Sequence, residues 1–105
     1  MQDMRKMKFP DQEQISLTDV LYALSDPTRL QIVKSLADNG EQSCCAFNLP
    51  IAKSTLSHHF KVLRDAGVIY TRVEGTQSIN SLRREDLNSR FPGLLDAVLH
   101  GSEPF

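Results

Sequence analysis

Short polar and cationic side chains recur between Ser54 and Gly67, and their types suit hydrogen bonding to nucleic acid. Serine and histidine bond to base edges or to phosphates, whereas lysine and arginine attract phosphates regardless of the base sequence. At roughly 100° per residue, these side chains share one arc of a helix. They are Ser54, Ser57, His58, Lys61, Arg64 and Asp65. An arc of this composition is suited to a DNA major groove.

Apolar side chains occupy the opposite arc of the same helical projection. They are Leu56, His59, Phe60, Val62, Leu63 and Ala66, with the histidine widening the stripe. Glycine at position 67 suits the residue that follows a helix. The pattern therefore predicts an amphipathic helix over 54–66 that docks on a core through its apolar face. We expect His59 to be half-buried and hydrogen-bonded to another helix, and His58 to point outward.

Two shorter helices are expected ahead of this one. The first covers about 16–25, because Ser16 followed three residues later by Asp19 resembles a capping box. The second covers about 26–37, where an opening Asp-Pro pair supplies the N-cap and the first helical residue. The Asn39-Gly40 pair is typical of the end of a helix.

The segments on either side of the amphipathic helix have weaker patterns. There is room for one short helix around 43–49, stopped by Pro50. Residues 68–74 are rich in β-branched and aromatic types, and 77–82 continue with alternating apolar residues after a Gly-Thr turn. This pattern predicts a two-stranded hairpin, the wing.

The last part of the chain has helical character over 85–91 and 94–99. The Pro92-Gly93 pair between them leaves open whether one helix continues through Pro92. The second piece is more apolar than so small a domain can bury, and together with the first helix it is a candidate dimer face. Alternatively, both helices complete the monomer core. The residues of this face are Leu17, Val20, Leu21, Leu94, Leu95, Val98 and Leu99.

Length and composition indicate one small domain. The chain has 105 residues, of which 40% are hydrophobic, and its net charge of −1 excludes a generally basic nucleic-acid protein. We expect a flexible N-terminal arm over 1–14, a single domain over 15–100 and a C-terminal tail over 101–105. No apolar run approaches the ~20 residues that span a membrane. No signal-peptide pattern opens the chain, so a cytoplasmic location without a membrane partner is expected.

Three segments of the chain resemble the ArsR-type winged helix-turn-helix transcriptional repressors. They read ALSDPTRLQIVKSL at 23–36, STLSHHFKVLRDAGVI at 54–69 and RVEGTQSI at 72–79. The resemblance covers about 17–82. It implies a mainly α fold with a small β-hairpin in the order α-α-α-α-β-β-α, and a homodimer built on the first and last helices. It also implies repression at operator DNA, relieved by a signal. We expect no cofactor.

The resemblance further implies roles for individual residues. Those that would face the major groove are Ser54, Thr55, Ser57 and His58. Those that would reach phosphates are Lys53, Lys61 and Arg64. Arg72, on the wing, would approach the adjacent backbone or the minor groove.

Members of this family often sense metals, but neither subgroup's ligand pattern is intact here. The arsenic-sensing subgroup carries Cys-x-Cys, whereas Cys44 and Cys45 are adjacent. The zinc-sensing subgroup takes ligands from both ends of the last helix, where this chain offers Asp86, His100 and Glu103 at altered spacing and across Pro92. A soft ion at the two thiolates is an alternative.

The effector is otherwise open. Cys44 and Cys45 precede the amphipathic helix, so oxidation or alkylation of either thiol is a candidate switch, and burial as small core residues is the alternative. A small organic ligand in a dimer groove would leave no motif. An enzyme is not expected, because the chain has no Gly-rich phosphate loop. A protein-interaction module would present exposed apolar anchors on 54–64 instead of cations.

Overall fold

The first helix begins at the residue predicted to cap it. In the computed structural model, which describes residues 9–47 and 49–101, α1 spans Leu17–Ala23. The Ser16 hydroxyl accepts a hydrogen bond from the backbone amide of Asp19 at 3.4 Å. The predicted start is confirmed, and the helix ends slightly earlier than expected.

The second helix, α2, spans Pro27–Asn39. The Asp26 carboxylate accepts hydrogen bonds from the backbone amides of Thr28 and Arg29 at 2.9 and 3.1 Å, as an N-cap should. The helix runs to Asn39 and stops at Gly40, whose φ is 79°. The predicted N-cap at Asp26 and the predicted stop at the Asn39-Gly40 pair are therefore confirmed.

The segment expected to form a short helix around 43–49 is built differently. Gln42–Ser43 form strand β1, and Cys44–Ala46 form a single 3₁₀ turn, η3. The strand pairs with the wing, and the side-chain amide of Gln42 donates to the hydroxyl and carbonyl oxygens of Ser35 at 3.0 and 3.1 Å. The pairing of Gln42 and Ser43 with β3 satisfies backbone groups at the start of this segment that a local helix would otherwise have paired. Only one helical turn of the expected helix remains.

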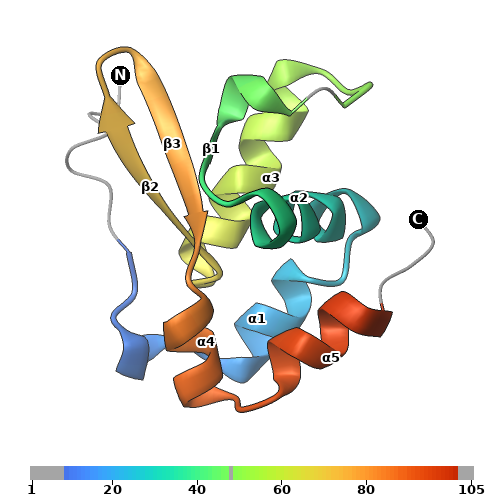
Figure 1. Cartoon of the computed structure of the whole chain (residues 1–105), viewed down its shortest axis with the longest axis vertical. Helices are drawn as coiled ribbons and strands as arrows, with labels where there is room; N and C mark the ends of the chain where they lie inside the picture. Colours follow the sequence, from blue (N-terminus) through green and yellow to red (C-terminus); the bar gives the residue numbers. More distant parts are fainter. Residues whose placement is uncertain (1–8, 48, 102–105) are drawn as a thin grey trace.

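The wing is the predicted hairpin with a third strand added. β2 covers Ile69–Glu74 and β3 covers Gln77–Leu82, paired antiparallel from Ile69 opposite Leu82 to Glu74 opposite Gln77. The sheet order is β1-β3-β2. Figure 1 shows the hairpin projecting beside the helices, with its tip at the same end of the molecule as the start of α3.

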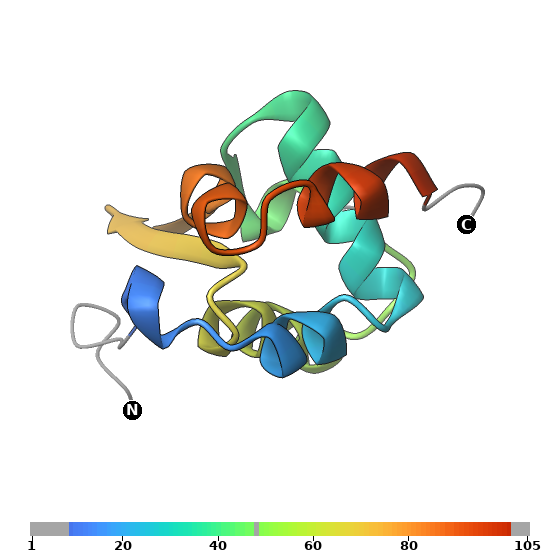
Figure 2. The same ribbon diagram turned by 90° about the horizontal axis from the view of Figure 1, so that it is seen from below.

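The amphipathic helix is α3, Lys53–Asp65. Gly67 follows with φ 84°, and a Cβ there would lie 2.7 Å from Cγ1 of Ile15. Glycine is therefore required both for the turn and for the close approach. Figure 2 shows α1 and α3 on one side of the molecule and the last two helices on the other.

The last helix is broken at Pro92. α4 spans Arg84–Arg90 and α5 spans Leu94–Gly101, with Gly93 at φ 84° between them. These two helices and α1 lie at the end of the molecule opposite the wing tip (Figure 1). This end corresponds to the predicted dimer face.

Two residues of that face belong to the monomer core. Val20 and Leu95 are 1% and 2% exposed, which corrects their placement on a dimer surface. Leu17 and Leu21 are 45% and 46% exposed. The half-buried remainder consists of Leu94, Val98 and Leu99, which pack against the core. Fewer apolar residues of the predicted dimer face are therefore exposed than the sequence suggested, and the dimer itself remains a prediction.

The expected terminal segments are described only in part. Residues 1–8 and 102–105 lie outside the described residues. Within the expected arm, Gln12–Gln14 form a 3₁₀ helix, η2, and the Gln12 amide donates to the Ser89 hydroxyl at 2.7 Å. Arg90 donates to the Ile15 carbonyl oxygen at 2.7 Å. These hydrogen bonds hold the end of the arm and the residue after it against α4.

Candidate nucleic-acid interface

The two faces of α3 separate as the sequence predicts. Phe60 and Leu63 are buried, and Leu56, His59 and Val62 are half-buried against the core. The side chains of the other face are exposed. They are Lys53, Ser54, Thr55, Ser57, His58 and Lys61. We call these six residues the α3 outer face.

The first turn of α3 has no side-chain cap. Its N-cap residue is Ala52, which makes no capping hydrogen bond. The opening backbone amides of a helix have no partner within the helix and carry a partial positive charge. Lys53 and Ser54 stand at this end, so the start of α3 suits a phosphate group.

Arg64 is less exposed than its predicted position on the outer arc implies. Its side chain is half-buried. Burial lowers the pKa of the Arg64 guanidinium, while the neighbouring Asp65 carboxylate acts in the opposite direction. The same carboxylate binds the Lys61 ammonium at 2.7 Å. Asp65 therefore offsets part of the charge at the end of α3.

The wing cation, Arg72, is held by two carboxylates. Its guanidinium donates to Glu41 and, at 2.9 and 3.1 Å, to Glu74. The hydrogen bond to Glu41, followed by that to Glu74, raises the pKa of Arg72 above its ordinary value. The expected contact between Arg72 and DNA remains a prediction, and the structure adds that Arg72 must leave two acids to make it.

Glu41 was not singled out from the sequence as a functional residue. It lies 31 positions before Arg72, and only the pairing of β1 with β3 brings it to the wing. No local spacing signals that contact.

His59 anchors α3 to the rest of the molecule, which confirms its predicted structural role. Its Nδ1 lies 3.1 Å from a terminal nitrogen of Arg29, on α2. Arg29 is 6% exposed and also donates to the carbonyl oxygens of Ala23 and Tyr22 at 2.7 and 3.2 Å. Arg29 was not recognised as a functional residue beforehand, although it belongs to the Asp-Pro-Thr-Arg-Leu segment. It ties the end of α1 and the start of α2 to α3.

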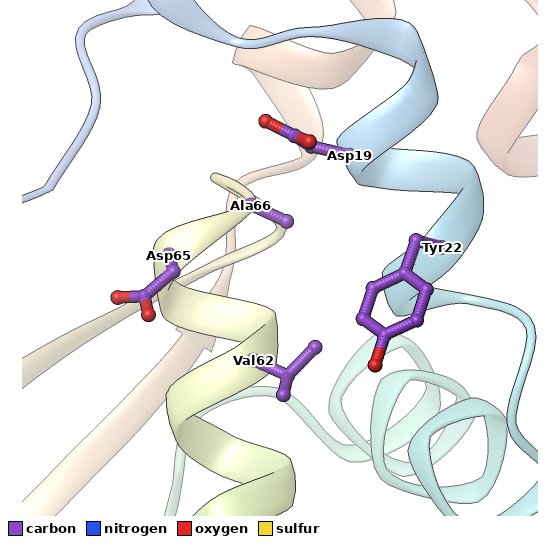
Figure 3. A pocket seen from close by; sticks show the side chains of 5 residues that line it. All are labelled: Asp19, Tyr22, Val62, Asp65 and Ala66. Carbon is purple, nitrogen blue, oxygen red and sulfur yellow. The ribbon is translucent and has the colours of Figure 1, made fainter.

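Among the pockets formed by the described residues, two adjoin α3. One, of about 240 Å³, lies between α1 and α3. Figure 3 shows Tyr22 of α1 and Val62 of α3 pointing into the space between the two helices, with Asp19, Asp65 and Ala66 around it. The other, of about 430 Å³, lies at the start of α3 and is called the Cys44 pocket here. Its lining residues are Cys44, Phe47, Leu49, Ile51, Lys53, Leu56, Ser57 and Phe60.

The candidate metal ligands Asp86 and His100 each interact with a different protein group. Asp86 on α4 binds Arg83 at 3.0 Å, and Nδ1 of His100 on α5 lies 2.8 Å from the carbonyl oxygen of Asp96. Glu103 lies outside the described residues. Over 9–47 and 49–101, no three His, Cys, Asp or Glu residues are grouped to hold a metal ion.

The two cysteines are described unequally. Cys44 is half-buried, lies in η3 and lines the pocket at the start of α3. The side chain of Cys45 lies outside the described part of the chain.

Within the described part of the chain, no helix is both long and apolar enough for a membrane span.

Comparisons with known proteins agree on one kind of protein. The family model described as "Bacterial regulatory protein, arsR family" matches residues 26–71. An uncharacterised HTH-type transcriptional regulator of Bacillus subtilis, YceK, is 35% identical over 82 residues, which cover 75% of this chain and 82% of the relative. The arsenical resistance operon repressor of the same organism is 35% identical over 79 residues, which cover 73% of this chain and 71% of that repressor.

A solved structure adds agreement in three dimensions. The crystal structure of the transcriptional repressor BigR from Xylella fastidiosa superposes with a TM-score of 0.58 at 30% identity. The superposition covers 71% of this chain and 85% of that one.

Proposed function

Because the chain belongs to the arsR family of bacterial regulatory proteins and is a DNA-binding transcriptional repressor, we propose that α3 reads the major groove of an operator. The observation that carries this assignment is the separation of faces on α3: every apolar side chain of its stripe is buried or half-buried, and the outer face is polar and exposed. A recognition helix needs this division, since one face docks on the protein and the other meets base edges.

Individual roles follow from chemistry. Ser54, Thr55, Ser57 and His58 carry donors and acceptors that suit base edges. Lys53, Lys61 and Arg64 supply phosphate contacts, and the uncapped start of α3 adds backbone amides. In the wing, Arg72 reaches the adjacent backbone or the minor groove once it leaves Glu41 and Glu74.

The repressor acts as a homodimer in this proposal. Leu17 and Leu21 on α1 are exposed apolar residues that a second subunit would cover. Two-fold symmetry then places two copies of α3 in major grooves about one helical turn, ~34–36 Å, apart. Since bacterial operator DNA is cytoplasmic, the protein acts in the cytoplasm.

A signal must release the dimer from DNA, and a 100-fold release needs about 2.7 kcal/mol of coupling. We propose the Cys44–Cys45 pair as the thiol sensor. Cys44 shares a pocket with Lys53, Leu56 and Ser57 of α3. Oxidation or alkylation at this place adds atoms against the start of the recognition helix.

The test uses fluorescence anisotropy at fixed salt, with the protein's own upstream intergenic DNA and an unrelated duplex. Reduced protein should bind the upstream DNA more tightly than the unrelated duplex. Mild oxidation with hydrogen peroxide should weaken that binding in the natural chain but not in a Cys44→Ser/Cys45→Ser variant. Equal release from both proteins would remove the thiol sensor, and equal affinity for both duplexes would remove operator reading by α3.

A further inference from the structure

The Cys44 pocket has the composition of a small-molecule site. Five of its lining residues are aliphatic or aromatic: Phe47, Leu49, Ile51, Leu56 and Phe60. Its volume of about 430 Å³ lies within the roughly 300–1,000 Å³ that such sites occupy. The rings of Phe47 and Phe60 meet edge to face with centroids 5.4 Å apart, so the apolar wall is formed by both η3's flank and α3. An apolar body is the complementary occupant.

One cation stands in the lining. Lys53 is exposed at the first position of α3, and its ammonium pairs with no carboxylate among the described residues. The partial positive charge of the helix start adds to it. None of the described residues that line the pocket is acidic. The electrostatics of this pocket therefore favour an anionic group joined to the apolar body.

We propose that the Cys44 pocket binds an apolar organic acid, such as a medium-chain carboxylate, with its hydrocarbon part against Phe47, Leu49 and Phe60 and its carboxylate at Lys53. This inference rests on the proposed function for its consequence, because Lys53 and Ser57 also belong to the α3 outer face. A carboxylate at Lys53 occupies the place of a DNA phosphate. The acid and the operator thus compete for the same residues, without a conformational change being required.

Binding is tested first on the DNA-free protein. Decanoate, below its micelle concentration, is titrated by calorimetry into the Cys44→Ser/Cys45→Ser variant, so that thiol chemistry plays no part. Saturable binding is expected, with decanol at least 5-fold weaker because it lacks the charge. A Leu49→Trp variant fills the pocket and should lose at least 10-fold in decanoate affinity. Equal binding of decanoate by Leu49→Trp, confirmed as folded by circular dichroism, overturns the site.

Should Leu49→Trp fail to fold, Lys53→Gln serves with Lys61→Gln as its matched control. Both substitutions remove one lysine from the α3 outer face, but only Lys53 lines the pocket. Lys53→Gln should abolish the preference for decanoate over decanol, and Lys61→Gln should keep it. Preserved preference in both variants contradicts the assigned carboxylate position.

Competition is tested separately by anisotropy. Decanoate should weaken operator binding at least 10-fold, and Leu49→Trp, which changes no DNA-facing residue, should bind the operator normally and resist the acid. Saturable binding of decanoate together with unchanged operator affinity refutes the competition. If the protein binds no operator DNA at all, the proposed function fails, while calorimetry still decides whether the pocket takes the acid.

Discussion

Lys53 on the α3 outer face and Arg72 on the wing differ in whether carboxylates already bind them. Lys53 stands exposed and without a carboxylate partner among the described residues, whereas Arg72 is bound by Glu41 and Glu74. A phosphate can approach Lys53 directly, but at Arg72 it must displace two carboxylates. A cation can therefore be accessible to solvent and still be unavailable to DNA, because neighbouring carboxylates bind it. In the proposed complex with DNA, α3 would supply the first affinity, and the wing would supply a contact that Glu41 and Glu74 restrain.

The largest effect is expected from the buried side of α3. Leu63→Ala removes a fully buried side chain and should lower the free energy of unfolding by about 2–5 kcal/mol. Val73→Ala on the exposed part of the wing is the control, with an expected change within about 0.5 kcal/mol. Urea denaturation followed by circular dichroism measures both. Similar losses in the two variants would show that α3 does not carry more of the core than the wing.

The next effect sharpens the role of the α3 outer face in reading sequence. His58→Ala should cost about 1–3 kcal/mol in operator binding, the usual cost of losing a base contact, and much less on an unrelated duplex. Anisotropy on both duplexes gives the comparison. Equal losses would assign His58 to phosphates instead of bases.

Releasing the wing cation should strengthen binding to any DNA. Glu41→Gln removes the first of the two carboxylates that hold Arg72, so affinity should rise about 3- to 10-fold on operator and unrelated duplex alike. The slope of log affinity against log salt should steepen by about 1, as for one added phosphate contact. In an Arg72→Gln background the same substitution should leave the slope unchanged. A steeper slope there would mean that Glu41 repels DNA directly, independently of Arg72.

The smallest effect concerns Lys61. Asp65→Asn removes its partner in an exposed i,i+4 pair, which is worth about 0.3–0.5 kcal/mol. Affinity for unrelated DNA should rise by roughly 2-fold, and the unfolding free energy should fall by a few tenths of a kcal/mol. If the increase equals that of Glu41→Gln, the restraint on the wing is no stronger than that on α3.

Local sequence patterns predicted the hairpin, the faces of α3 and the α-helices, but the helix expected around 43–49 was wrong, since a strand and a single 3₁₀ turn stand there instead. The capping roles of Ser16 and Asp26 involve partners two or three residues away, and the division of α3 follows from its helical repeat. The break at Pro92 was visible as a signal, although its outcome was open until the structure placed α4 and α5 on either side of it. The family and its repressor function were recognisable from the same local motifs.

Contacts between distant residues could not be read in this way. The pairing of β1 with β3, the grip of Glu41 on Arg72 and the bond between Arg29 and His59 join positions about 30 or more apart. The burial of Val20 and Leu95, which were expected at a dimer face, likewise could not be predicted from local patterns.

Which residues can cap a helix, form a turn or face a groove follows from the local sequence, because backbone hydrogen bonding and side-chain periodicity act over a few residues. Which exposed cations are already paired with carboxylates, and which apolar residues are already buried, depends on the folded arrangement of distant segments. The physical reason is that the energy of a charge or an apolar surface depends on what the fold brings against it.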